Sequence, residues 1–451
     1  MYEPMNHQTT KDLTHGNIYK QLITLSIPLI IGNILQQFYN TIDAFVVGRY
    51  AGTEEFAAIG IAGTVMNLFL FLIVGCCTGL SVLFARYYGT QDYAMLRRQH
   101  FTALSAGLLF SVLLCMIGLL CMRGLLGLIQ TPAELLSYTS QYLFWIFLSL
   151  PAAFLYNMYA AALRASGDTV AALGVLAAAV FSNLLLDLLL VAHLHLGIKG
   201  AAQATALTQL FSALLCICYL FRKHREFLFR RDDCRMDPIM LSSTLRCSLA
   251  TAVHQGSLYI GKMLVQGTVN TGGLDAISAY TAATRIEGFA NSFGDSCSAA
   301  TSVIVSQSYG SGNRDRVRKT FRSSIRLTAI LGLICAIILY LSAPLTIRLL
   351  LGTSAGQSYS ISYATAYLTV ISFFYPFCFT GGSFTGLYNG TGKVGLTLAG
   401  STLQISIRVL LSWLLFGSAG LPAVAVATGI GWICANVFWG ICYRFKVSPH
   451  L

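Results

Sequence analysis

Long apolar runs follow one another along the whole chain, and short polar segments separate them. Each run has about the ~20 residues that a helix needs to cross the hydrocarbon core of a bilayer. Divided where charges or Gly and Pro clusters interrupt them, the runs predict twelve membrane-spanning helices. The expected spans cover residues 18–47, 54–84, 99–122, 135–163, 169–192, 199–221, 240–269, 274–307, 323–347, 359–388, 394–417 and 421–443. The pattern therefore predicts an all-α polytopic membrane protein.

Composition supports this fold class and excludes others. Of the 451 residues, 55% are hydrophobic and only 10% are charged, whereas a soluble domain has roughly 25% charged residues. These figures exclude a water-soluble globule and a disordered chain. The formal net charge of +12 is not gathered in a basic patch with interleaved aromatic residues, so we expect no nucleic-acid partner.

The distribution of positive charge predicts the topology. Of the 29 Lys and Arg residues, 21 fall on the loops of one side and four on the loops of the other. The positive-inside rule then places the tails 1–17 and 444–451 in the cytoplasm, together with a basic linker at 222–239. The linker separates two six-helix lobes, an N-lobe at 18–221 and a C-lobe at 240–443. We expect this linker to be solvated and close to anionic lipid headgroups.

The second half of the chain repeats the first at an offset of about 220 residues. SVLFARYYG (Ser81–Gly89) aligns with SVIVSQSYG (Ser302–Gly310), and Pro151–Gly167, ending LRASG, aligns with Pro376–Gly392, ending YNGTG. Each half has an even number of spans and begins in the cytoplasm, so the repeats are parallel. This symmetry favours a transporter with a substrate site between the halves, opened alternately to each side, although a duplicated channel or scaffold would share it.

Three stretches carry a resemblance to a known family. They are SIPLIIGNILQQFYNTIDAFVVGRYAGTEEFAAIGIA, LRASGDT, and VQGTVNTGGLDAISAYTAATRIEGF followed by SQSYGSGNRDRVRK. They resemble the multidrug and toxic compound extrusion (MATE) transporters of bacteria, and the similarity extends over nearly the whole chain. It implies a V-shaped pair of six-helix lobes in the inner membrane that exports mostly cationic, lipophilic compounds in exchange for H⁺ or Na⁺. Apart from that ion it implies no cofactor, and we expect a monomer that contacts membrane lipids.

Carboxylates inside membrane spans are costly and are therefore candidate functional groups. Asp43 and Asp187 both lie in the outer half of the membrane, because their spans run outward and end a few residues later. Asn183 lies one turn before Asp187 on the same helix face, and Thr205 enters at a similar depth on the next span. The first-lobe cation site of the family matches these four positions, and Tyr142 is similar to a tyrosine that approaches it. We predict that they bind the coupling H⁺ or Na⁺.

Other residues of the first lobe are candidates for substrate binding and for a hinge. Gln36, Tyr39 and Asn40 form a polar stripe on the first span, and we assign them with Asn157 to substrate binding. Plain interhelical hydrogen bonding explains this stripe equally well. Pro28, inside the same span, permits either a hinge or a static kink.

The second lobe carries mixed charges within its spans. Its ionisable residues, three basic and two acidic, are Lys262, Arg285, Glu287, Asp295 and Arg408. We expect a structural ion network from them. Some branches of the family carry a carboxylate where this chain has His254 and Gln255, which argues against cation binding in this lobe. We expect His254 to form an interhelical hydrogen bond.

Alternatives to a drug antiporter differ in the features they need. A flippase for a lipid-linked saccharide would use basic groups for a pyrophosphate headgroup, whereas the acidic first lobe suits cation coupling. An enzyme is not expected, because the chain lacks HExxH and duplicated aspartyl motifs. A channel is not expected, because the chain contains no repeated filter-like sequence. The loop ARYYGTQDYAMLRRQ lacks the signature of the major facilitator family. The sequence leaves the substrate and the choice between H⁺ and Na⁺ open.

Overall fold

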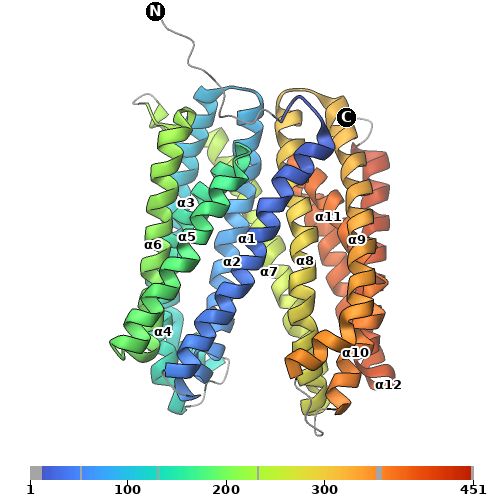
Figure 1. Cartoon of the computed structure of the whole chain (residues 1–451). Coiled ribbons are helices and arrows are strands. Elements are labelled where there is room, and N and C mark those ends of the chain that lie inside the picture. Colours follow the sequence, from blue (N-terminus) through green and yellow to red (C-terminus); the bar gives the residue numbers. More distant parts are fainter. Residues whose placement is uncertain are drawn as a thin grey trace, which may run out of the picture. The chain divides into compact units, whose positions relative to one another are not determined.

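The computed structural model is all-helical in the residues that it describes, which are 13–50, 53–128, 131, 133–230, 233–351 and 358–447. Long helices run through both halves of the chain (Figure 1). In chain order they are α1 (Ile18–Tyr50), α2 (Thr53–Gly89), α3 (Tyr93–Leu128), α4 (Ala133–Ala165), α5 (Thr169–Asp187), η1 (Leu188–His193), α6 (Gly197–Lys223), η2 (Arg225–Phe227), α7 (Pro238–Asn270), α8 (Gly273–Gly310), α9 (Arg314–Leu351), α10 (Ser358–Ser372), α11 (Tyr375–Gly390), α12 (Val394–Cys442) and η5 (Tyr443–Val447).

These helices supply the twelve predicted spans. Within the described ranges, eight helices are long and apolar enough to cross a membrane, and α10 with α11 adds a candidate span that is bent by 54°. One of the eight, α12, contains two of the predicted spans, because its backbone leaves the helical conformation at Gly420. The other two spans are α7 and α8, which are long enough but too polar to meet the same criterion.

Two local features of the sequence produce the breaks in α12 and between α10 and α11. Gly420 has a φ of 61°, and a side chain there would collide with the Tyr363 hydroxyl, which accepts a hydrogen bond from the backbone N–H of Leu421 at 2.9 Å. Pro376 stands in the first turn of α11 and cannot continue the preceding helix, which accounts for the bend between α10 and α11. By contrast, α1 and α4 continue past Pro28 and Pro151.

The chain forms two compact units whose boundaries fall inside helices. The first unit contains Ile31–Ala252, and the second contains Thr14–Ile30 and Val253–Leu451. The beginning of α7 therefore belongs to the first unit, and the beginning of α1 belongs to the second. Each unit is described separately below.

The beginning of α7 packs closely on α2 within the first unit. Gly75 and Gly79, four residues apart on α2, leave room for the α7 backbone. A Cβ at Gly75 would lie 2.6 Å from the Cα of Ala252, and one at Gly79 would lie 2.7 Å from the carbonyl carbon of Cys247. Ser248 of α7 also donates a hydrogen bond to the carbonyl of Cys76 at 3.2 Å. The first turns of α7 are thus fixed to the first unit.

The beginning of α1 is held within the second unit by one buried arginine. Arg316, at the start of α9, donates hydrogen bonds to the carbonyls of His15 and Gly16 at 3.0 and 3.1 Å and to Oε1 of Gln21 at 2.6 Å. A guanidinium group presents several donors in a planar fork, which suits it to several acceptors at once. Arg316 therefore ties the start of α1 to the turn between α8 and α9.

The segment after α6 is packed on the first unit rather than solvated, so the expectation for this part of the linker is wrong. Phe227 is fully buried, and its carbonyl oxygen lies 3.1 Å from Nδ1 of His100, within hydrogen-bonding distance. Asp233 is also buried and pairs with Nε of Arg97 at 2.6 Å. Exposed arginines such as Arg230 alternate with these buried groups, and a count of charge alone does not reveal the anchors.

Candidate functional site

Asp187 occupies a change of helix type in the first unit. It is the last residue of α5, and the π-helical segment η1 follows at once. Its side chain is fully buried, with an exposed fraction of 0%. Single turns of π-helix inside an α-helix often occur at functional sites. The sequence predicted one continuous helix at 169–192, and hydrophobic periodicity gives no signal for the change at Asp187.

Asn183 and Thr205 lie near the level of Asp187. Asn183 is four residues earlier on α5 and is 2% exposed, so it lies on the same helix face one turn away. The neighbouring helix α6 runs antiparallel, and a Cβ at Gly200 would lie 3.0 Å from the carbonyl oxygen of Leu190. Because the helices are antiparallel, counting five residues forward from Gly200 and five back from Leu190 brings Thr205 level with residue 185 of α5. This level lies between Asn183 and Asp187.

Several buried polar atoms around this level have no hydrogen-bond partner within the described part of the chain. They are Nδ2 of Asn183, Oγ1 of Thr205, Oγ1 of Thr208 and Oε1 of Gln209. Buried polar atoms normally find a partner in the protein, in water or in an ion. A buried carboxylate beside hydroxyl and amide oxygens can hold a proton, a hydrated cation or Na⁺. Gln209 was not predicted, although it lies one turn after Thr205 on α6.

The backbone of α1 brings position 43 to the same level. A Cβ at Gly32 would lie 3.3 Å from Cδ2 of Leu176 on α5, and both helices run in the same direction. Eleven residues further along each helix, position 43 of α1 is level with Asp187 of α5. The side chains of Tyr39, Asn40 and Asp43 lie outside the described part of the structure, whereas α1 is helical at all three positions.

The remaining predicted residues of the first lobe occupy varied positions. Tyr142 is buried on α4, and its hydroxyl lies 3.9 Å from the sulfur of Met66 on α2. Asn157, half-buried on the same helix, donates a hydrogen bond to the carbonyl of Ala153 at 2.8 Å. Gln36 is exposed on α1. Pro28 lies two residues before the end of the α1 segment that belongs to the second unit.

A carboxylate that was not predicted from the sequence, Glu55, joins the starts of two helices of this unit. Glu55, in the first turn of α2, accepts a hydrogen bond from the backbone N–H of Ile198 at the start of α6. A negative charge at a helix N-terminus interacts favourably with the helix dipole. Gly197 allows this contact, because a side chain there would collide with the Glu55 carboxylate. The starts of α2 and α6 are thus joined.

The second-unit charges form contacts inside that unit. Glu287 is buried and accepts a hydrogen bond from the Tyr367 hydroxyl at 3.2 Å. Arg408 donates one to the Tyr280 hydroxyl at 3.1 Å. Nε2 of His254 lies 2.8 Å from the hydroxyl of Ser401.

These contacts agree with a structural role for Glu287, Arg408 and His254. His254 on α7 joins α12 through Ser401, which is the interhelical hydrogen bond expected for it. Lys262, Arg285 and Asp295 have exposed side chains, in contrast to Glu287.

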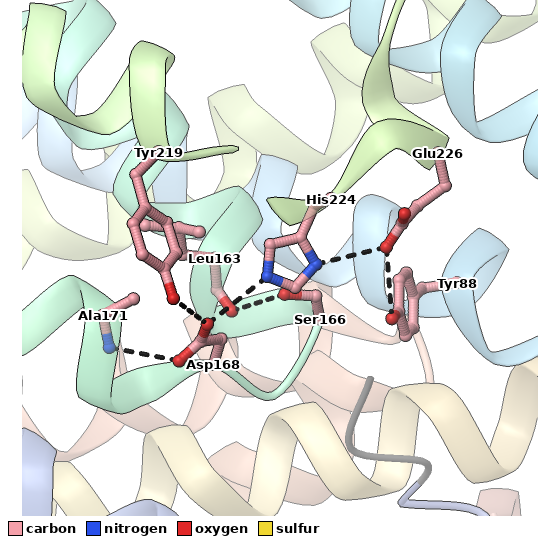
Figure 2. A network of polar contacts seen from close by, with 8 residues as sticks. All are labelled: Tyr88, Leu163, Ser166, Asp168, Ala171, Tyr219, His224 and Glu226. Atoms are coloured by element: carbon pink, nitrogen blue, oxygen red, sulfur yellow. Dashed lines mark hydrogen bonds and ion pairs between the residues drawn. The ribbon is translucent and has the colours of Figure 1, made fainter. Parts of the chain in front are cut away.

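A polar network closes the end of the first unit at which α4, α5 and α6 meet the linker (Figure 2). Asp168 precedes α5 and accepts hydrogen bonds from the backbone N–H of Ala171 at 3.1 Å and from the Tyr219 hydroxyl at 3.0 Å. The ring of His224 lies between two carboxylates, with Nε2 3.4 Å from Asp168 and Nδ1 3.1 Å from Glu226. The LRASGD motif is therefore anchored to the start of the linker.

The carboxylates keep His224 protonated at neutral pH. Burial favours the neutral ring, but hydrogen bonds and charges from Asp168 and Glu226 outweigh it and raise the pKa of His224 from 6.5 to about 9. For Asp168, burial acts to raise the pKa, and the hydrogen bonds from His224, Ala171 and Tyr219 reverse this and lower it. The network is a closed set of charges without exposed reactive groups, so we assign it to stability.

This network predicts a loss of stability at alkaline pH. A raised pKa stabilises the folded state fully below the unfolded value of 6.5, and the contribution disappears as pH rises toward about 9. The lowered pKa of Asp168 acts in acid, where stability falls as pH drops below about 4. Thermal unfolding of the detergent-solubilised protein should show a decline between pH 6.5 and 9 of at most about 3 kcal/mol. His224→Gln should flatten this decline, and an unchanged alkaline profile would contradict the assignment.

Comparisons with known proteins identify what this chain is similar to. The MatE family model matches residues 28–189 and 250–414, which is more than half of the chain. The probable multidrug resistance protein YpnP of Bacillus subtilis (strain 168) is 27% identical over 432 residues, with 93% of each chain covered. The multidrug export protein MepA of Staphylococcus haemolyticus (strain JCSC1435) is 23% identical over 320 residues, with 71% of each chain covered.

Solved structures share the fold. One, described as an outward-facing conformation of a multidrug resistance MATE family transporter of the MOP superfamily, has a TM-score of 0.90 at 22% identity. A second, of MATE in complex with MaL6, has a TM-score of 0.91 at 23% identity. In both cases the match covers 98% of this chain and 99% of the other. At these identities the likeness shows a shared multi-span helical fold.

Proposed function

Because this chain belongs to the MatE family of multidrug efflux transporters, we propose that it exports lipophilic, mostly cationic compounds in exchange for H⁺ or Na⁺. We assign the coupling ion to Asp43, Asn183, Asp187 and Thr205 in the first unit. The observation that carries this assignment is the fully buried carboxylate of Asp187 at the α-to-π change, beside unsatisfied polar atoms of Asn183 and Thr205.

A pair of carboxylates in a water-poor site gives the coupling a physical basis. Position 43 is level with Asp187, and two nearby negative charges repel one another strongly where the dielectric constant is low. Binding of one proton or one sodium ion removes part of this repulsion. A conformation that brings the groups together is then favoured when the ion is bound, and one that separates them when it is absent.

Alternating access is supported by the two helices that each belong to both units. The first turns of α1 lie in the second unit and the rest in the first, and the division follows Pro28 by two residues. The first turns of α7 lie in the first unit and the rest in the second. Any change in the position of one unit relative to the other must therefore bend α1 and α7 or release their first turns. We assign Pro28 to the hinge of α1.

The contact of Arg316 with the start of α1 provides a test of this mechanism. Arg316→Met removes three hydrogen bonds from a charged donor, each contributing about 1.5–3 kcal/mol. We expect the start of α1 to detach more often and to expose Cys297, which is buried on α8 close to Ser26 of α1. Thiol labelling followed by peptide mapping should show faster modification of Cys297.

Lys319→Met is the matched control for this test, because Lys319 is an exposed cation three residues further along α9. In this variant the thiol reagent should modify Cys297 at the wild-type rate. Equal rates in wild type and Arg316→Met would show that this contact does not restrain α1.

We place both termini in the cytoplasm, because 21 of the 29 Lys and Arg residues fall on that side in the twelve-span topology. Cys234 is exposed on the linker and reports the orientation. A membrane-impermeant thiol reagent should modify it in inverted vesicles and leave it unmodified in intact cells. We also propose that the monomer is the transporting unit, which cross-linking in the membrane tests.

The proposed function is tested with purified protein in liposomes loaded with a fluorescent lipophilic cation. An imposed gradient of H⁺ or Na⁺ should move the cation against its own concentration gradient. The gradient that is effective identifies the coupling ion. Failure of both gradients, with passive leakage of the dye instead, would exclude an antiporter and favour a channel.

A further inference from the structure

One exposed face of α9 changes from cationic to apolar along the helix. Arg322 and Arg326 are exposed, and their spacing of four places them on one side. The same side continues with large aliphatic side chains that are more than half exposed, namely Ile330, Leu333, Ile337 and Leu341. Aliphatic side chains that are exposed on a membrane-spanning helix contact lipid tails, whereas cations beside them reach the headgroups. Arg322 and Arg326 therefore lie at the level of the headgroups.

These two cations exceed what membrane topology requires. Lys and Arg on loops and at helix ends suffice to orient a chain, but Arg326 lies 12 residues after the start of α9, about 18 Å along its axis. The sequence repeat gives an internal comparison, at the offset that aligns SVLFARYYG with SVIVSQSYG. At this offset the positions of the two arginines are occupied in α3 by Phe101 and Ser105. The extra cations thus belong to the second half alone.

The start of α1 lies beside this part of α9. Both helices begin at the same end of the second unit (Figure 1), and Nη2 of Arg316 donates a hydrogen bond to Oε1 of Gln21 at 2.6 Å. Tyr19 of α1 lies close to Ser323 of α9. Because Lys20 stands between Tyr19 and Gln21 in the chain, it is held beside the first turns of α9, which carry the cations.

The exposed side of α1 turns the same way as the cationic face of α9. Lys20, Ile23 and Ile27 are exposed, and at about 100° per residue they lie about 40–100° ahead of Tyr19, which faces α9. The cations of α9 lie about 60–100° behind Ser323, which faces α1. In neighbouring helices that run in the same direction, these opposite rotations point to the same side. The two faces therefore form one surface, with cations at one level and aliphatic side chains beyond them.

Negative charge is scarce on both helices here. Residues 14–30 contain no Asp or Glu, and Asp315 is the only acid of α9. Asp315 lies about 10 Å before Arg322 along the axis, at the end away from the aliphatic side chains. The other cations at the start of α9 add positive charge, namely Arg314, Arg316, Arg318 and Lys319. Lys20 and Arg322 form no side-chain hydrogen bond or ion pair with any residue in the described ranges, so both are available to a ligand.

We propose that an anionic phospholipid binds to this surface and bridges α1 and α9. Its phosphate lies between Lys20 and Arg322, with Arg326 beside it, and its acyl chains lie along Ile23 and Ile330. Clusters of Lys and Arg between membrane-spanning helices are typical sites for anionic headgroups. The site requires only that the chain is embedded in a membrane, so it does not depend on the transported substrate or on the coupling ion. A bound lipid favours the position of α1 in which Lys20 lies beside α9.

Native mass spectrometry of the purified full chain in detergent measures this binding, with dioleoylphosphatidylglycerol as the probe. A cation beside an anionic headgroup changes the affinity about fivefold. Lys20→Gln and Arg322→Gln should therefore each raise the Kd of the most tightly bound lipid about fivefold, and the double variant should raise it about 25-fold. Both side chains are exposed, so the variants should keep the wild-type Tm. Dioleoylphosphatidylcholine, which has the same tails and no net charge, should bind to the wild-type protein about tenfold more weakly.

Arg98→Gln is the matched control, because Arg98 is an exposed cation of α3 that aligns with Lys319 in the repeat. It should keep the wild-type Kd. An unchanged Kd in Lys20→Gln or in Arg322→Gln, or an equal rise in Arg98→Gln, would overturn the bridging site. Equal binding of the two lipids would also overturn it. Displacement of the lipid by inorganic phosphate would show a phosphate site that needs no acyl chains, which again overturns the proposal.

Discussion

Asp187→Asn is expected to abolish gradient-driven efflux while the protein remains folded and inserted in the membrane. The substitution keeps the size of the fully buried side chain and removes the negative charge that the coupling ion neutralises. Without that charge, ion binding no longer distinguishes the conformations of the transporter, so a gradient cannot drive the cycle. Dye accumulation under an imposed H⁺ or Na⁺ gradient should fall to the level of protein-free liposomes.

Asp43→Asn should have the same effect, because both carboxylates are needed for coupling. His254→Gln is the control: Gln retains a hydrogen-bonding side chain for Ser401, and His254 lies in the other unit. It should transport nearly normally. Wild-type coupled efflux in either Asp variant, or loss of efflux in His254→Gln with intact folding, would move the coupling site elsewhere.

Gly79→Leu should destabilise the protein severely. A Cβ at this position would lie 2.7 Å from the backbone of Cys247, so a larger side chain must push α7 away from α2. Overpacking against backbone costs about 3 kcal/mol, more when the neighbour cannot move. Thermal unfolding in detergent should show a Tm lowered by roughly 6–12 °C, from about 2–4 °C for each kcal/mol in a unit of this size.

Gly63→Leu provides a control on the same helix. No described atom lies within 4 Å of a Cβ built at Gly63, so this change should leave the Tm close to that of the wild-type protein. A comparable loss of stability in the two variants would mean that glycine matters for α2 itself rather than for its contact with α7.

The sequence predicted the twelve spans well because hydrophobic length is a strong signal. The division predicted between 394–417 and 421–443 also matches a real break, at Gly420 within α12, whereas the break before Pro376 falls inside the single span predicted at 359–388. The same signal was weakest for α7 and α8, whose polar residues lower their hydropathy. They were still predicted as spans, because their apolar runs are long enough and the sequence repeat aligns them with the first two helices of the chain.

The candidate site was predicted at the level of residues but not of geometry. Asn183 and Asp187 were placed on one face by their spacing of four, and the helix that carries them has that arrangement. The π-helical segment after Asp187 depends on backbone hydrogen bonds, which leave no periodic trace in an apolar run such as Leu188–His193. The unsatisfied oxygen of Gln209 likewise depends on how α6 packs.

Contacts between distant parts of the chain were beyond the sequence analysis. Arg316 reaches backbone carbonyls some 300 residues earlier, and carbonyls carry no sequence signature. His224 lies within the basic linker, where the sequence gives no sign of its role, and it is buried between two carboxylates. Charge counting predicts which side of the membrane a loop occupies, but it does not predict which charges are paired.

The most direct test of ion-coupled export records the substrate and the ion together. In liposomes without any imposed gradient, a lipophilic cation added on one side should drive H⁺ or Na⁺ in the opposite direction through the wild-type protein, followed with a pH-sensitive dye or with ²²Na⁺. The same addition should move no ion through Asp187→Asn. Substrate movement without ion counterflow in the wild-type protein, or undiminished counterflow in Asp187→Asn, would contradict the account.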